Sequence, residues 1–160
     1  MDLTTKTAAI AEILKSRGET VAVLESSTGG LVSASLLAVP GASAYYLGGG
    51  VIYTQTSRAE LARVTAGEME GIRAATEPYA ELLAAKARDI HGATWGISET
   101  GATGPTGNRY GDDPGHTCFA IAGPRSAVRT LETGSDDRNA NMWTFRDAVL
   151  DLFAECLGGE

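Results

Sequence analysis

The chain has few cysteines, no excess of basic residues and no long apolar run. Its 160 residues include only two cysteines, Cys118 and Cys156, which are too few for a disulfide framework. We expect both to be buried free thiols in a reducing compartment. The formal net charge of −7 argues against a nucleic-acid-binding surface, which normally carries a basic face.

Membrane and secretory classes are disfavoured in the same way. No apolar run reaches the length that spans a bilayer, and residues 1–18 lack the basic start and apolar core of a signal peptide. We therefore expect a cytoplasmic protein without a membrane partner. Hydrophobic residues make up 43% of the chain, enough to bury a core, so residues 1–160 are predicted to fold as a single domain.

The hydrophobic period alternates between helical and extended along the chain. Helices are predicted over residues 4–17, within 27–41 (opening at residues 28–30 and ending before Pro40), over 57–64, 68–92 (interrupted before Pro78) and 139–157. Strands are predicted over residues 20–25, 48–55, 94–99, 117–122 and 127–132. Strands placed between long helices predict a layered α/β domain.

The segment ESSTGG, residues 25–30, lies where a predicted strand passes into a helix. The first free amides of that helix make an anion site, and Gly29 and Gly30 let a phosphate or carboxylate approach the backbone. The simpler alternative is that Ser27 or Thr28 only caps the helix.

Two further segments carry candidate chemistry. Residues 43–58 bring together Ser43, Tyr53, Ser57 and Arg58, a nucleophile set of the serine–lysine kind or simply the polar residues of a surface hairpin. Residues 99–115, ETGATGPTGNRYGDDPG, read as a long loop that joins two strands of one domain. Long loops inside compact domains are frequently functional.

Together these segments resemble one known family. Residues 25–54 resemble the ESCTGG…PGSS…GG…YSN stretch of the CinA C-terminal domain family, which includes nicotinamide-mononucleotide amidases. The loop SETGATGPTG is similar to that family's TGIAGPGG segment, and residues 133–153 are similar to its closing GDR-plus-helix segment. The resemblance runs from about residue 8 to residue 157.

The resemblance implies a three-layer α/β/α domain with a mixed sheet, usually a homo-oligomer. It implies hydrolysis of a pyridine-nucleotide carboxamide to the carboxylate and ammonia, with no metal and no organic cofactor. The partner is then a small nucleotide or another phosphate-bearing ligand. For the oligomer, we expect the glycine-rich segments and the pair Tyr45 and Tyr46 to lie partly in a subunit interface.

Site residues follow from the same resemblance. Ser43 matches the second serine of PGSS and is the candidate nucleophile, and Tyr53 matches the signature tyrosine. The residues expected to bind the substrate are Ser26, Thr28, Gly29 and Gly30 of the first motif, Thr100, Gly101 and Gly104 of the loop, and Arg138 of the GDR motif. An arginine fork suits a phosphate because it donates to two oxygens at once.

The chain also departs from the family pattern. Arg58 stands where the amidases have a lysine, Gln55 replaces an asparagine, and Met142 replaces an arginine. A lysine can lose its proton in a dry site and act as a base, whereas a guanidinium cannot. Two hypotheses follow: an amidase of the pyridine-nucleotide type, or a catalytically altered nucleotide-binding module of the same fold. A third reading, a purely structural oligomerisation domain, would not need the glycine-rich loop.

Overall fold

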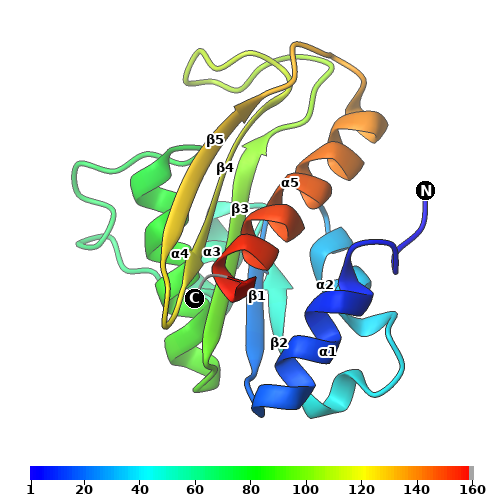
Figure 1. Cartoon of the computed structure of the whole chain (residues 1–160). Coiled ribbons are helices and arrows are strands. Elements are labelled where there is room, and N and C mark those ends of the chain that lie inside the picture. The colour runs from blue at the N-terminus through cyan, green and yellow to red at the C-terminus, as the bar shows by residue number, and fades with distance from the viewer. Residues whose placement is uncertain (159–160) are drawn as a thin grey trace.

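The computed structural model describes residues 1–158 as one sheet with helices on both faces (Figure 1). The helices are α1 (Thr7–Arg17), α2 (Leu31–Leu37), α3 (Gln55–Leu61), α4 (Glu77–His91) and α5 (Arg138–Gly158), with a short 3-10 turn, η1, at Ala42–Ala44. The strands are β1 (Val21–Glu25), β2 (Tyr46–Val51), β3 (Trp95–Ala102), β4 (His116–Ala122) and β5 (Ala127–Glu132).

The five strands lie in the order β2-β1-β3-β4-β5. The first three are parallel, and β4 and β5 run antiparallel to their neighbours. Helices α1, α2 and α5 cover one face, while α4 covers the other (Figure 1). The predicted three-layer α/β/α architecture with a mixed sheet is therefore confirmed.

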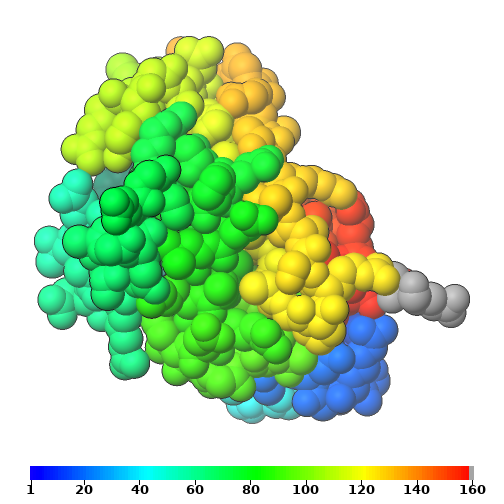
Figure 2. All heavy atoms as spheres, turned by 90° about the vertical axis from the view of Figure 1, so that its left-hand side faces the viewer, coloured from blue at the N-terminus to red at the C-terminus, as the bar shows by residue number. Residues whose placement is uncertain are grey.

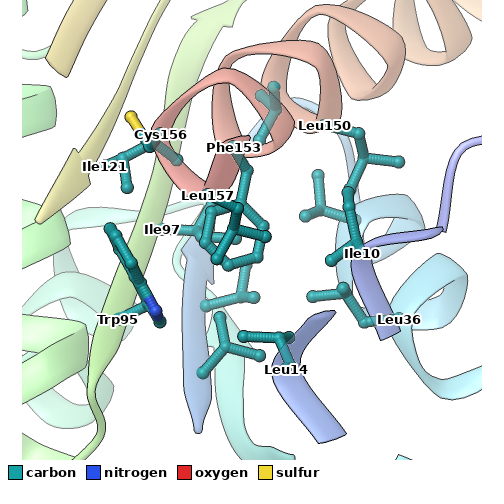
Figure 3. Close-up of a cluster of buried hydrophobic side chains, with 14 of the residues drawn as sticks. Ile10, Leu14, Leu36, Trp95, Ile97, Ile121, Leu150, Phe153, Cys156 and Leu157 are labelled. Carbon is teal, nitrogen blue, oxygen red and sulfur yellow. The ribbon is translucent and has the colours of Figure 1, made fainter. Parts of the chain in front are cut away.

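The larger core lies between the sheet and the layer of α1, α2 and α5. Trp95 of β3 and Phe153 of α5 meet edge to face, with ring centroids 5.6 Å apart, a favoured aromatic arrangement. Figure 3 shows these rings beside apolar side chains that reach in from α1, α2 and β4. Tyr45 belongs to this core, since it is fully buried and donates its hydroxyl to the carbonyl of Leu36. The prediction that Tyr45 lies in a subunit interface is therefore wrong; Tyr46 is half-buried.

On the opposite face, α4 packs directly on the backbone of β3. A Cβ at Gly96 would lie 2.0 Å from the carbonyl oxygen of Ala84, closer than any real contact. Glycine is therefore required here for the helix to approach the strand.

Several predicted boundaries are corrected. The strand predicted over residues 48–55 is β2, which ends at Val51, and the helix predicted over 57–64 is α3, which begins at Gln55. The helix predicted over residues 68–92 begins only at α4, because Thr76 accepts a hydrogen bond from the Tyr79 amide and Pro78 sits in the first turn, where its missing N–H costs nothing. Helix α2 begins at Leu31 because Gly29 and Gly30 have positive φ. The loop predicted over 99–115 is shorter, since β3 continues to Ala102.

The two cysteines are free and buried, as predicted. Among residues 1–158, no helix is long and apolar enough to cross a membrane.

Candidate functional site

The candidate site lies at the carboxyl ends of the parallel strands. In open α/β sheets this edge is where ligands bind, because the loops that follow the strands converge there. Three segments converge here: residues 26–30 after β1, residues 52–58 after β2, and the loop 103–115 after β3. Figure 2 shows the yellow-green loop after β3 lying above the teal and green segments that follow β2.

The larger of two cavities at this edge has a volume of about 490 Å³. Its walls come from the segment after β2, the start of α4 and the loop after β3. It is lined by Ser26, Ile52, Tyr53, Thr54, Gln55, Arg58, Ala74, Ala75, Tyr79, Thr100, Gly101, Asn108, Arg109 and Tyr110. Five of these lining residues are predicted site residues from three separate motifs: Ser26, Tyr53, Arg58, Thr100 and Gly101.

A second cavity of about 210 Å³ adjoins the first. Tyr53, Gly101 and Asn108 line both, so the two cavities meet at these residues. The second is completed by Ser27, Ala102, Thr103, Gly104, Thr106, Gly107 and Arg138. The glycine-rich loop and Arg138, predicted to lie beside a ligand, therefore share a wall.

Arg138 connects the loop to Tyr53. One guanidinium nitrogen donates to the carbonyl of Gly104 at 2.6 Å, and the other lies 3.3 Å from the Tyr53 hydroxyl. Gly104 has a φ of +106°, and a Cβ there would lie 2.7 Å from the Asp136 carbonyl oxygen. A side chain at position 104 would thus displace the backbone that Arg138 holds.

Two further arginines lie against aromatic rings of the larger cavity. The Arg58 guanidinium lies 5.8 Å from the centre of the Tyr79 ring, and the Arg109 guanidinium lies 5.1 Å from that of Tyr110. These are cation–π distances. Tyr79, Arg109 and Tyr110 were missed from the sequence, because nothing in the chain order shows that the start of α4 faces the loop after β3.

Side-chain contacts fix the loop 103–115 that follows β3. Arg73, which precedes α4, makes two hydrogen bonds to the Asp112 carboxylate, at 2.8 and 3.1 Å. His116 contacts Glu132 through Nδ1 and the Ala75 carbonyl through Nε2. Burial lowers the pKa of His116, but these two hydrogen bonds offset it, so the net pKa is raised. His116 thus braces the loop base and does not line either cavity.

The anion site predicted at the start of α2 is filled by the chain's own carboxylates. Glu25 accepts hydrogen bonds from the amides of Gly30, Val32 and Ser33. The Thr28 amide donates to Glu99 at 2.9 Å. The amides of Gly29 and Leu31 donate to backbone carbonyls, so no amide of this group is left for a phosphate, and the anion site expected at Thr28, Gly29 and Gly30 is not open in this structure.

The same segment is closed to a ligand sterically. Thr28 is fully buried, and a Cβ at Gly29 would lie 3.0 Å from the terminal methyl carbon of Met142. Neither glycine lines a cavity. The two glycines instead allow the turn from β1 into α2, where both adopt positive φ.

Ser43, the predicted nucleophile, lies away from the cavities. It is exposed in η1, before β2 begins, whereas Tyr53 follows the end of β2. The six residues of β2, at about 3.3 Å each, place the two side chains at opposite ends of the strand. Within one chain, therefore, Ser43 does not meet Tyr53 or Arg58.

Glu99 is, with Glu25, one of two fully buried acids among the described residues of the region. It is fully buried, and burial raises its pKa, while hydrogen bonds from Ser27, Thr28 and Thr117 act in the opposite direction. Glu99 was not among the predicted site residues, and Ser27 was predicted only as a helix cap. The available signal was a glutamate inside an otherwise apolar strand, which is rarely buried without a partner.

Comparison with known proteins identifies the family from the sequence, and solved structures share the fold. The model of the family described as CinA C-terminal domain matches residues 3–157. The chain is 38% identical over 116 residues to a CinA-like protein of Acaryochloris marina, covering 72% of this chain and 28% of that protein. It is 41% identical over 127 residues to a CinA-like protein of Anaeromyxobacter sp. (strain K), covering 78% of this chain and 31% of that protein. The chain thus spans less than a third of the length of these curated relatives.

Solved structures agree on the fold. The competence/damage-inducible protein CihA of Agrobacterium tumefaciens superposes with a TM-score of 0.90 at 22% identity, over 99% of this chain and 97% of that one. A competence or damage-inducible protein of Enterobacter asburiae superposes with a TM-score of 0.85 at 28% identity, over 98% and 97%.

Proposed function

Because this chain belongs to the CinA C-terminal domain family, we propose that it binds a phosphate-bearing pyridine nucleotide and hydrolyses its carboxamide to a carboxylate and ammonia. The two adjoining cavities are the proposed binding site. Their combination of cationic and aromatic walls is what such a ligand requires, since it carries an anionic phosphate at one end and a flat ring at the other.

The observation that carries the proposal is the charge of the cavity walls. Arg58, Arg109 and Arg138 line the cavities, and among the described residues no aspartate or glutamate does. This occurs in a chain whose formal net charge is −7. A local positive site in an acidic protein attracts a small anion, and a guanidinium fork holds phosphate oxygens in pairs.

Aromatic side chains supply the second half of the recognition. Tyr53, Tyr79 and Tyr110 line the larger cavity. Ligand sites are commonly built from such apolar rings with a few polar groups that fix orientation. We expect the pyridine ring to lie among the tyrosines and the phosphate to lie near Arg138.

Nucleotide binding without hydrolysis is a second candidate function. Arg58 stands where the resemblance predicts a lysine, and a guanidinium cannot accept a proton at neutral pH. Ser43 lies outside both cavities. Both observations favour a binding module unless other residues supply the nucleophile and the base.

Calorimetric titration tests the binding step. Nicotinamide mononucleotide should bind saturably, and nicotinamide riboside, which lacks the phosphate, at least tenfold more weakly. Arg138→Gln should raise the Kd for the mononucleotide by about tenfold to a hundredfold, since a charge-assisted hydrogen bond contributes about 1.5–3 kcal/mol. Arg17→Gln, at the exposed end of α1, is the matched control and should bind as the wild type does.

Ammonia release separates the two candidate functions. Saturable binding with ammonia release supports the amidase, and saturable binding without it supports the binding module. If nicotinamide mononucleotide does not bind at all, and Arg138→Gln changes nothing, both candidates are wrong for this ligand class.

A further inference from the structure

Ser27 and Glu99 form a hydrogen-bonded pair behind the smaller cavity. The Ser27 hydroxyl donates to Oε1 of Glu99 in a very short contact. Glu99 lies within β3 and Ser27 in the turn after β1, so the pairing of β1 with β3 sets the geometry of the pair. A hydroxyl held against a carboxylate is the arrangement in which a serine can lose its proton.

Three hydroxyls surround Glu99, and of these three residues only Ser27 lines one of the two cavities. Thr28 and Thr117 contact the carboxyl group at 3.0 and 2.9 Å, but both are fully buried. Ser27 is 5% exposed and, of the three, it alone lines the smaller cavity. The exposed part of Ser27 therefore opens toward the space that Arg138 also lines.

We propose that Ser27 is a nucleophile and Glu99 is its general base, acting on the carboxamide of a ligand bound in the two cavities. The inference rests on the proposed function and supplies the pair that Ser43 and Arg58 do not provide within one chain.

The reaction balances with these groups and water alone. The Ser27 oxygen bonds to the carboxamide carbon, and its proton passes to the Glu99 carboxylate. The carbon–nitrogen bond then breaks, and the same proton leaves with the nitrogen as ammonia. Water attacks the resulting ester, again giving a proton to Glu99, and that proton returns to Ser27 as the carboxylic acid product departs.

The environment of Glu99 makes the step dependent on pH. Glu25 of β1 contacts the same Thr28 hydroxyl as Glu99 does. Arg138 of α5 and Tyr53, which follows β2, line the smaller cavity that Ser27 also lines. His116 of β4 lies in the next position to Thr117 and so points to the opposite face of the sheet. Burial raises the pKa of Glu99, so the carboxylate form, and with it the reactivity of Ser27, increases as the pH rises.

Labelling with diisopropyl fluorophosphate tests the pair without requiring that the nucleotide be known. The reagent is small and reacts with activated serines, and mass spectrometry of the digested protein locates the label. We expect the label on Ser27, at a rate that rises with pH through one titration. Glu99→Gln, which keeps the shape of the side chain, should slow labelling at least tenfold, because a general base contributes about a hundredfold or more. Ser16→Ala, on α1, is the control and should leave the rate unchanged.

The outcomes separate this inference from the proposed function. Label on Ser27 without ammonia release from nicotinamide mononucleotide supports the pair and overturns that nucleotide as the substrate. Ammonia release that persists in Ser27→Ala, or label on Ser43 in place of Ser27, overturns the pair and leaves the amidase in place. An unlabelled Ser27 at every pH in the wild type also overturns it, whether or not the variants fold.

Discussion

Glu25 and Glu99 are paired across the parallel strands β1 and β3, and the hydroxyl of Thr28 lies 2.7 Å from the first carboxyl group and 3.0 Å from the second. A hydroxyl carries a single proton, so it donates to one carboxyl group at a time. Both glutamates are fully buried. This one side chain therefore joins two acids that would otherwise repel each other, next to the candidate site.

Replacing Thr28 with valine should destabilise the fold although the shape is nearly unchanged. The substitution removes the hydroxyl donor that the two buried carboxyl groups share, while their backbone amide donors remain, at a cost of about 1 kcal/mol in the free energy of unfolding. Urea unfolding followed by circular dichroism measures it. Thr56→Val, at an exposed position of α3, is the control and should change the free energy of unfolding by less than about 0.5 kcal/mol. Equal effects of the two substitutions would contradict the importance of the shared hydroxyl.

Glu99 should make the stability of the protein fall as the pH rises. Burial raises its pKa in the folded state, whereas glutamate in an unfolded chain ionises near pH 4.3. Above that pH the folded state still holds the proton and the unfolded state has lost it, so the contribution of Glu99 to stability is lost as the pH rises through the folded pKa. Glu99→Gln does not titrate.

The measurement for Glu99 is the free energy of unfolding in urea, for wild type and Glu99→Gln, at a series of pH values from acidic to mildly alkaline. The stability of the wild type relative to Glu99→Gln should decrease as the pH rises above about 4.3. A difference that stays constant over this range would show that the pKa of Glu99 is the same in both states.

Gly96→Ala should separate α4 from the sheet. The new methyl group would lie 2.0 Å from the Ala84 carbonyl oxygen, so the helix must shift. Overpacking of this kind costs about 1–3 kcal/mol in the free energy of unfolding. Gly67→Ala is the matched control, because its Cβ meets nothing nearer than 3.9 Å. Thermal or urea unfolding of both variants measures the loss of stability. If Gly96→Ala has the same free energy of unfolding as the wild type, the close packing of α4 on β3 is refuted.

The edge strand β2 should lie in a contact between copies of the chain. Leu47 and Val51 on this strand are 44% and 40% exposed, and β2 pairs only with β1 in the described sheet. Apolar side chains on an uncovered edge favour association. Light scattering at micromolar concentration should report an oligomer, and Leu47→Glu should lower the measured mass toward that of a monomer. Ala85→Glu is the control: it adds the same charge at an exposed position of α4 and should leave the measured mass unchanged. A wild-type monomer would contradict the expectation.

The order of helices and strands was predictable because local pattern determines it. The β-branched run at β1 and the spaced apolar residues of α5 each bury a face whose period is visible in the sequence. The resemblance of the glycine-rich motifs to one family added the layers and the mixed sheet. Tyr53, Thr100 and Arg138 line the two adjoining cavities, because each lies at or near the end of an element at the same edge of the sheet.

The roles of Ser43, Thr28 and Glu99 depended on tertiary structure. Ser43 and Tyr53 are ten positions apart in the chain, but an extended strand between them carries them to opposite ends of the sheet. The amides at the start of α2 looked free in the sequence, and the pairing of β1 with β3 brings Glu99 onto one of them. By itself the sequence determined which elements form. Which side chains meet was decided by strand order and register, because these set the contacts between residues far apart in the chain.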